Sequence, residues 1–294
     1  MTKRSRGGQG ASHARQQTFS FLTGPDVPLL AVPQPDGEAV AEAAPRHEVE
    51  EQRAEGGAVS QGGARAAPAA LFVGAASTAS PVGEAWPLDG GILAEGDTFL
   101  REMEGSPDLE ELGRVARGCR RCPLREGCRG VVFGEGDPRA VMMFVGEGPG
   151  QTEDEMGRPF VGRAGQLLDK WIGLLGLKRH QVYITNVVKC RPPGNRTPLT
   201  EEMRSCWPIL RHQLLLIRPR ILVCLGSPAL QALVHPSARI TRLRGNWLER
   251  GSMRIMGTFH PAAVLRDPTK ERPVHEDLRR LRDEYLRVAP RGGG

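Results

Sequence analysis

The chain has no apolar run long enough to cross a membrane, which excludes a transmembrane protein. Its N-terminus is basic but lacks the apolar core of a signal peptide, so we expect a cytoplasmic protein that does not bind membranes. Cysteine is scarce, with six residues in 294. Because the cytoplasm is reducing, paired cysteines there bind metal more often than they form disulfides. We therefore interpret the cysteines as metal ligands first.

The chain also lacks the usual phosphate-binding fingerprints. Residues 146–150 read GEGPG, but they have neither the spacing of a dinucleotide-binding loop nor the Lys-Ser/Thr pair of a P-loop. The glycines allow a ligand to approach the backbone closely. Within such a loop, Glu147 can position a water or stabilise a developing cation. A solvated turn that carries one carboxylate is the alternative interpretation.

The first third of the chain has no sustained apolar periodicity. Residues 1–104 are rich in Ala, Gly, Pro and Glu, and we predict a disordered low-complexity extension that could bind an unidentified partner. The folded domain is expected over residues 105–290. Residues 1–100 carry a net charge of −5 and the remainder carries +11. A basic domain favours a polyanionic partner, although an arginine-rich proteome would give the same charge.

Strand and helix signals alternate along the folded part. Short apolar runs predict strands over residues 141–145, 182–185, 220–225 and 254–258. Helical periodicity follows over residues 164–175, 200–218, 227–234 and 276–288. This order predicts an α/β fold, a three-layer α/β/α sandwich with a central four-stranded parallel sheet. Ligands lie at the carboxyl ends of such strands, where Glu147, Asn186 and His260 fall.

Three long strings then indicate a family. Residues 146–168 read GEGPGQTEDEMGRPFVGRAGQLL, residues 185–196 read TNVVKCRPPGNR and residues 260–266 read HPAAVLR. In this order they resemble the motifs of the family 4 uracil-DNA glycosylases, the iron–sulfur type of that superfamily. The resemblance runs from about residue 119 to residue 286, and the first hundred residues have no counterpart.

The resemblance implies a monofunctional DNA N-glycosylase of base excision repair. Such an enzyme flips uracil out of DNA, at a cost of a few kcal/mol, and hydrolyses its N-glycosidic bond to leave an abasic site. Lyase activity is not expected, because no lysine is obviously placed to form a Schiff base. Uracil-containing DNA is then the partner, and we expect a monomer associated with the nucleoid.

The resemblance also assigns the substrate-binding residues. Phe160 would stack on the flipped ring, and the Asn186 amide would donate to uracil O4 and accept from N3–H, the reverse of what cytosine presents. Gly146 and Gly148 complete the substrate loop. Glu153 would fill the space that the thymine methyl group needs. The alternatives are a core aromatic for Phe160, a strand-ending Asn186 and a solvated acidic turn at Glu153.

Two residues carry the predicted chemistry. Negative charge develops on uracil O2 during cleavage, and His260 can donate a hydrogen bond to that oxygen. In the broader superfamily an Asp often stands two positions after the first loop glycine, but Gly148 occupies that place here. This departure moves the water-orienting and cation-stabilising role to Glu147.

Contacts to DNA are predicted near these motifs. Val264 or Leu265 would wedge into the duplex, with core packing as the alternative for either. Phosphate contacts are expected from four basic residues, Lys189, Arg191, Arg196 and Arg266.

The resemblance implies a structural [4Fe–4S] cluster. Its four ligands would be Cys119, Cys122, Cys190 and Cys206. Four thiolates suit zinc and iron–sulfur alike, so spacing does not separate the two. Cys128 is an alternative ligand in place of Cys190 or Cys206, and Cys224 is predicted to be a buried small hydrophobe.

Two other functions remain open. One is a superfamily member that binds uracil-DNA covalently or without turnover, which would carry a basic, His-containing insert between the third and fourth strands. Residues 240–247 contain arginines but no histidine, which disfavours this function. The other is a metal-containing nucleic-acid-binding module without catalysis.

Overall fold

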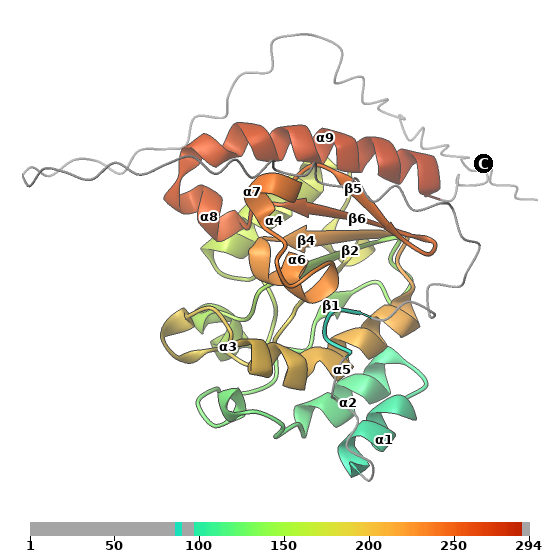
Figure 1. Ribbon diagram of the computed structural model, residues 1–294, viewed down its shortest axis with the longest axis vertical. Coiled ribbons are helices and arrows are strands. Elements are labelled where there is room, and N and C mark those ends of the chain that lie inside the picture. The colour runs from blue at the N-terminus through green and yellow to red at the C-terminus, as the bar shows by residue number, and fades with distance from the viewer. Residues whose placement is uncertain (1–85, 90–96, 290–294) are drawn as a thin grey trace, which may run out of the picture. The chain divides into compact units, whose positions relative to one another are not determined.

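Six strands in the described residues form one sheet, in the order β1-β3-β2-β4-β6-β5 (Figure 1). The structure is a computed structural model, and it describes residues 86–89 and 97–289. The four central strands run parallel: β3 (Tyr183–Asn186), β2 (Met142–Gly146), β4 (Ile221–Leu225) and β6 (Met253–Thr258). They correspond to the four predicted strands, and the α/β class is confirmed.

The predicted strand number was wrong, because the sheet has two further strands at its edges. β1 (Glu135–Gly136) pairs antiparallel with β3, and β5 (Trp247–Arg250) pairs antiparallel with β6. β1 is only two residues long, and β5 is partly exposed along its length. Neither strand contains the all-apolar run that identified the central strands. An edge strand does not need such a run because it is partly exposed to solvent.

Helices cover both faces of the sheet and make the predicted three layers. One face packs on α4 (Arg163–Leu174), α8 (Pro261–Arg266) and α9 (Glu271–Val288), and the other packs on α5 (Thr200–Ile217) and α6 (Ser227–Leu233). Figure 1 shows α9 and α5 on opposite sides of the sheet. The remaining helices are α1 (Thr98–Glu104), α2 (Leu109–Arg117), α3 (Gln151–Met156) and α7 (Ile240–Leu243). Single 3-10 turns span Pro123–Arg125, Arg179–Gln181, Pro193–Asn195 and Pro268–Lys270.

The central strands are apolar throughout because both of their faces are buried. In β2, Met142 and Phe144 belong to the core on the α4 side, whereas Met143 and Val145 belong to the core on the α5 side. Successive side chains of a strand point to opposite faces, so a strand covered on both sides needs an apolar residue at each position.

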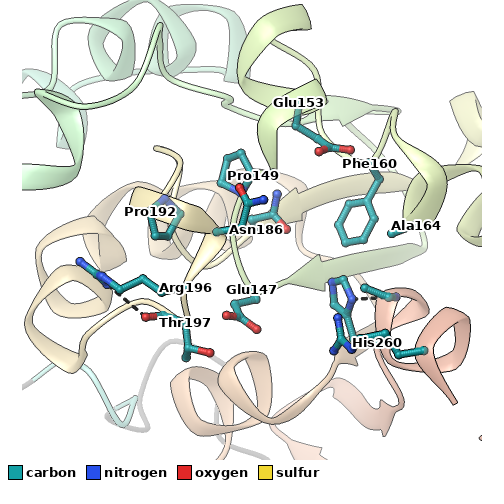
Figure 2. Close-up of a pocket in the computed structure, with 15 residues that line it drawn as sticks. Glu147, Pro149, Glu153, Phe160, Ala164, Asn186, Pro192, Arg196, Thr197 and His260 are labelled. Atoms are coloured by element: carbon teal, nitrogen blue, oxygen red, sulfur yellow. Dashed lines mark hydrogen bonds between the residues drawn. The ribbon is translucent and has the colours of Figure 1, made fainter. Parts of the chain in front are cut away.

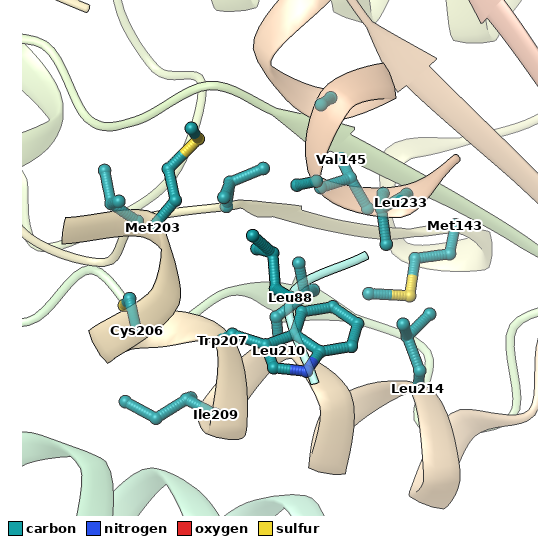
Figure 3. Packing of buried hydrophobic residues seen from close by; sticks show 14 of the residues in the cluster. Leu88, Met143, Val145, Met203, Cys206, Trp207, Ile209, Leu210, Leu214 and Leu233 are labelled. Carbon is teal, nitrogen blue, oxygen red and sulfur yellow. The ribbon is translucent and has the colours of Figure 1, made fainter. Parts of the chain in front are cut away.

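The ordered part of the chain begins before residue 105. α1 lies inside the range predicted as a disordered extension, and its Leu100 and Met103 are buried in the core. Residues 86–89 also pack on the domain: the Trp86 ring lies 5.4 Å from that of Trp207, whose Nε1 donates to Asp89 at 2.8 Å. Figure 3 shows the neighbouring Leu88 among the side chains of this core. The disorder predicted for the rest of residues 1–104 lies outside the described residues.

A buried acid ties α9 to the end of β6. Asp277 accepts a hydrogen bond from Thr258 Oγ1 at 2.6 Å and pairs with Arg244 at 2.8 Å. Gly245 has a φ of +71°, and a Cβ there would lie 2.4 Å from the Asp277 carboxylate. The last strand of the parallel sheet is thereby fixed to the last described helix, two residues before His260.

The strand order determines where a ligand can bind. From β2 the chain continues to β3 on one side, while β4 lies on the other side, so a crevice opens at the carboxyl ends of these strands. The loops that follow β2 and β3 stay paired, since Val187 N donates to Gly146 O and Val188 N donates to Glu147 O. No helix within the described residues combines the length and apolarity needed to cross a bilayer.

Candidate active site

A cavity of about 370 Å³ opens at the carboxyl ends of the parallel strands. This volume lies in the range of roughly 300–1,000 Å³ that is usual for ligand pockets. Figure 2 shows the four side chains on which the predicted chemistry depends around this cavity. All four line it: Glu147, Phe160, Asn186 and His260.

The Asn186 side chain is buried without a partner. It ends β3 and is 1% exposed, and neither its Nδ2 nor its Oδ1 has a hydrogen bond among the described residues. An unsatisfied buried polar group costs about 1–3 kcal/mol. Because both amide atoms lack protein partners while the residue lines a cavity, the amide is available to read a ligand with one donor and one acceptor.

Gly146 is the reason that Asn186 and Phe160 can meet. A Cβ on Gly146 would lie 2.4 Å from Asn186 Oδ1 and 2.4 Å from Phe160 Cζ. Any larger residue would separate the amide from the ring. Gly148 is equally confined, because a Cβ there would lie 2.7 Å from the Val188 side chain.

The Phe160 ring is held by a strained turn and by a carboxylate. Its backbone is left-handed, with a φ of +49°, a conformation that is uncommon for a non-glycine residue. Glu153 Oε1 accepts from the N–H groups of Val161, at 2.9 Å, and Gly162, at 2.8 Å. The ring centroid lies 5.5 Å from that of His260. Glu153 also lines the cavity, so its predicted role against thymine stays a prediction, and its visible action is to brace the Phe160 turn.

His260 is a neutral hydrogen-bond donor in this setting. It caps α8, and its Nδ1 accepts from the backbone N–H of Ala262 at 3.1 Å, which leaves the proton of the neutral ring on Nε2. Burial, together with the charge of Arg266, lowers the pKa of His260 to about 4. The ring therefore remains neutral at physiological pH and can offer Nε2–H to a ligand oxygen.

Glu147 is a partly desolvated carboxylate beside the same cavity. Burial raises its pKa above the usual value, while a hydrogen bond from the Thr197 side chain and the charge of Arg266 act in the opposite direction. At neutral pH the group can thus accept a proton more readily than an exposed glutamate.

Four thiols gather in a second, small cavity next to this site. It is lined by the four predicted cluster ligands, Cys119, Cys122, Cys190 and Cys206. Cys128 does not line it but lies near the Cys190 thiol, and its Sγ donates to the Arg125 carbonyl at 3.7 Å. Burial raises the pKa of Cys206 to about 12. Cys224 is fully buried in β4, as the sequence predicts.

The thiols do not converge as ligands of one ion would. Within residues 86–89 and 97–289, no group of three or more His, Cys, Asp or Glu side chains is arranged to hold a single metal ion. A single zinc ion needs its thiolates at about 2.3 Å from one centre, whereas a cube of four irons and four sulfides holds them further apart. Four thiols on the wall of one cavity are a donor set that suits zinc and iron–sulfur alike.

Comparison with known proteins identifies the family. The model of the uracil DNA glycosylase superfamily matches residues 133–282. The chain belongs to this superfamily. It is 44% identical over 180 residues to a type-4 uracil-DNA glycosylase of Thermotoga maritima, covering 59% of this chain and 93% of that protein. A type-4 enzyme of Pyrobaculum aerophilum is 43% identical over 179 residues, covering 58% and 91%.

The same comparison separates type 4 from type 5. A type-5 uracil-DNA glycosylase of Pyrobaculum aerophilum is 35% identical over 146 residues, which cover 44% of this chain and 64% of that protein. The type-4 relatives match at higher identity and over nearly their whole length. The predicted resemblance to family 4 is therefore confirmed.

The predicted DNA-contacting residues of this uracil-DNA glycosylase homologue differ in solvent exposure. Val264 is 5% exposed and packs in the core, whereas Leu265 is 42% exposed. A wedge must reach the duplex, so Leu265 is the candidate and Val264 is a core residue. Of the basic residues, Arg266 lines the cavity. Lys189 is 1% exposed, so its predicted phosphate contact was wrong.

Two further arginines are engaged within the protein. Arg196 forms a two-pronged pair with Glu202, at 2.8 and 2.6 Å, and Arg191 Nε donates to Asn195 Oδ1 at 2.7 Å. Their phosphate contacts stay predictions, and Arg196 would have to share its guanidinium with Glu202. The pair also fixes the start of α5, because Glu202 accepts from Leu199 N at 2.7 Å.

Sequence reasoning missed two polar side chains of this superfamily member's cavity. Asn195 and Thr197 both line it, and Thr197 hydrogen-bonds Glu147. Asn195 has a φ of +56°, a conformation that asparagine tolerates better than most residues. The Gly-Asn pair at 194–195 signals such a turn, but nothing in the sequence shows that the turn folds back onto the Glu147 loop.

Proposed function

We propose that the protein is a uracil-DNA glycosylase that hydrolyses the N-glycosidic bond of uracil flipped out of DNA, as a step of base excision repair. The observation that carries the proposal is the buried, unpartnered amide of Asn186, which shares one cavity with Phe160, Glu147 and His260. Membership of the type-4 family supports the same activity.

Base recognition follows from the amide. Asn186 Nδ2 donates to uracil O4 and Oδ1 accepts from N3–H, while the Phe160 ring stacks on the flipped base. Cytosine has an amino group in place of O4 and an unprotonated N3. Its donor would face Asn186 Nδ2, its acceptor would face Oδ1, and neither hydrogen bond would form. Glu153 lines the cavity, and we propose that it fills the space that a thymine methyl group would need and so excludes thymine.

Bond cleavage uses the other two side chains. As the bond from C1′ to N1 breaks, its electron pair moves into the uracil ring and negative charge develops on O2, to which His260 Nε2–H donates. The Glu147 carboxylate stabilises the positive charge on the sugar and orients the water whose oxygen bonds to C1′. The Glu147 carboxylate takes up the proton that this water loses and later returns it to solvent, while the departing uracil anion takes up a proton from solvent. The products are an abasic site and neutral free uracil.

We further propose a [4Fe–4S] cluster on Cys119, Cys122, Cys190 and Cys206. The shared cavity of these thiols and the similarity to type-4 uracil-DNA glycosylases support it. When bound, the cluster would act as a structural cross-link. The four cysteines would join the segment before β1 to the loop after β3 and to α5. We propose a monomer that works on the DNA of the nucleoid.

The covalent or non-catalytic DNA-binding alternative has little support at this site. The chain between β4 and β6 contains one histidine, His235, which contacts Ser237 and does not line the cavity. Arg244, which lies in the same segment between β4 and β6, is paired with Asp277 inside the protein.

An excision assay tests the proposal. The full-length protein is incubated with single-stranded DNA that contains one uracil, and alkali is then added. Strand cleavage at the uracil supports the glycosylase, while DNA with cytosine or thymine at that position should stay intact. A stable protein–DNA adduct would indicate a covalent binder, and binding without either product would indicate a nucleic-acid-binding module. Asn186→Ala serves as the matched control and should abolish cleavage without loss of thermal stability.

A further inference from the structure

Lys189 is a buried basic residue whose Nζ pairs with no carboxylate among the described residues. It is 1% exposed and lies between the end of β3 and Cys190. The hydrogen bonds of its ammonium all go to neutral oxygens. Burying a charge is costly unless hydrogen bonds or an opposite charge compensate it, so the position of this lysine calls for a specific reason.

Three hydrogen-bond acceptors hold the Lys189 side chain in one orientation. Lys189 Nζ lies 2.6 Å from Thr185 Oγ1, 2.7 Å from Gln213 Oε1 and 2.7 Å from the backbone carbonyl of Asn186. Three acceptors match the three N–H groups of an ammonium. Lys189 thus binds the backbone of Asn186, the residue whose side-chain amide faces the cavity.

The acceptor on α5 is itself fixed. Gln213 Nε2 donates to Phe133 O at 2.9 Å and to the Tyr183 hydroxyl at 3.1 Å, which turns its Oε1 towards Lys189. Gln213 and Thr185 are both fully buried. The ammonium therefore sits in a rigid cage made by β3, α5 and the segment before β1.

The other end of Lys189 reaches the thiols. Its backbone N–H donates to Cys206 Sγ at 3.2 Å, and the next residue is Cys190. One residue thus contacts the four-cysteine site through its main chain and the carbonyl of Asn186 through its side chain. No other described residue hydrogen-bonds both groups.

The Asn186 amide is buried but has no hydrogen bond to a described residue that fixes its direction, so the position of its backbone matters. Both of its atoms lack hydrogen bonds within the described part of the chain, so its direction depends on its own backbone. Asn186 is the last residue of β3 to pair with β2. Backbone bonds continue past this point from Val187 N to Gly146 O and from Val188 N to Glu147 O, whereas the Asn186 carbonyl accepts from Lys189 Nζ.

We propose that Lys189 is a positioning residue that fixes the backbone of Asn186, and that it makes recognition of the base depend on the four-cysteine site. The proposal rests on the proposed function, because it assigns Asn186 to base recognition. A displacement of about 1 Å in such a group can lower a rate by about 10²-fold.

The test compares Lys189→Met with Lys170→Met. Methionine keeps the length and apolar stem of lysine but has no N–H, and Lys170 is an exposed residue of α4. Four quantities are measured on the full-length protein: the single-turnover rate of uracil excision, the affinity for abasic-site DNA, the iron content and the melting temperature.

For Lys189→Met we expect the excision rate to fall about 10²-fold, with the affinity for abasic DNA and the iron content retained. If Lys189 only stabilised the fold, the substitution would lower the affinity for abasic DNA and the iron content along with the rate. Lys170→Met should match the wild type in all four. An unchanged rate in Lys189→Met overturns the proposal, whereas absence of excision by the wild type refutes the proposed function instead.

A second variant decides the case in which Lys189→Met does not fold or loses iron. Thr185→Val removes one acceptor of the ammonium and leaves Lys189 and all cysteines in place. It should lower the excision rate on the order of fivefold, with iron retained. An excision rate equal to that of the wild type would then refute the positioning role.

Discussion

Glu147 is a partly buried carboxylate, and its ionisation has opposite effects on stability and on the proposed activity. Its folded pKa lies above the ordinary 4.5. A raised carboxyl pKa contributes stability that is complete below pH 4.5 and is lost as the pH rises through the folded value. At neutral pH the ionised group is therefore unfavourable for the fold, although the proposed reaction requires it.

Glu147→Gln should consequently raise the melting temperature at pH 8 and leave it nearly unchanged at pH 4. Excision should fall about 10²-fold or more, because glutamine can neither accept a proton nor stabilise a cation. Thermal denaturation at both pH values and a single-turnover assay check the two effects. A variant that is less stable than the wild type at pH 8 would contradict this account of Glu147.

His260 has the opposite linkage. Its pKa is about 4 in the folded protein, against the usual 6.5. The stability linked to this group is present above pH 6.5 and is lost as the pH falls towards 4, since only the unfolded chain takes up the proton readily. His260 thus favours the fold in the pH range in which its neutral ring is available for the proposed hydrogen bond to the substrate.

For His260→Gln we expect excision to fall about 10²-fold or more, through loss of the donor to uracil O2. Between pH 7 and pH 4.5 the wild type should lose more stability than the variant, measured by urea denaturation. The wild-type rate should show no loss from His260 protonation above pH 6. An acid limb centred near pH 6.5 that disappears in His260→Gln would mean that the ring titrates normally.

Among the secondary-structure elements, α4 depends on a residue outside it. Its N-terminal cap, Gly162, has no side chain, and Glu153 of α3 accepts from the free N–H groups of residues 161 and 162. Loss of a helix cap costs about 0.5–2 kcal/mol. Because Phe160 directly precedes this start, the cap also orients the ring that would stack on the base.

Glu153→Ala should therefore reduce both stability and excision, the latter about tenfold, whereas Glu153→Gln, which keeps an acceptor oxygen, should retain most of both. Chemical denaturation and excision kinetics are measured on the two variants. Thymine-containing DNA is tested in parallel: cleavage by Glu153→Ala would support thymine exclusion by Glu153. Equal behaviour of the two variants would show that the cap is unimportant.

The sequence was sufficient for elements that are buried on both sides and insufficient for those at the edges. β2 and β4 were found because each position is apolar, but β5, which carries Glu249 and Arg250 on a partly exposed edge, has no such signal. Helix α1 was missed because it is short and only two of its residues, Leu100 and Met103, are buried.

The same limit applied to the site. Glu147, Asn186 and His260 were located because parallel strands bring their carboxyl ends together, and they do line one cavity. Lys189 was misjudged because adjacent positions in a loop can point to the solvent or to the interior. The pairing of Arg196 with Glu202 likewise depends on where α5 begins. These contacts are set by packing between distant segments, which residue spacing does not show.

At the scale of the whole molecule, the thiols would join segments that are far apart in the chain. Cys119 and Cys206 line one cavity although 86 residues separate them. A cross-link that closes a long loop removes much of the freedom of the unfolded chain. The cluster should therefore stabilise the domain as a whole, including the Asn186 loop.

Cys206→Ser should lose iron and melt at a lower temperature, whereas Cys128→Ser should keep both the iron content and the melting temperature of the wild type. Cys128 is the matched control, since it neighbours Cys190 but does not line the cavity of the thiols. Iron analysis and thermal denaturation under anaerobic conditions provide the test. The reverse result would assign Cys128 as a ligand in place of Cys206.

The tie between Asp277 and Thr258 has a consequence for synthesis on the ribosome. The strand that leads to His260 pairs with β4 and β5, and its last residue, Thr258, also donates to Asp277 of α9, the last described helix. A nascent chain that has already released the loops of Glu147 and Asn186 would still lack this bond beside His260. Full activity should thus appear only once α9 has been synthesised.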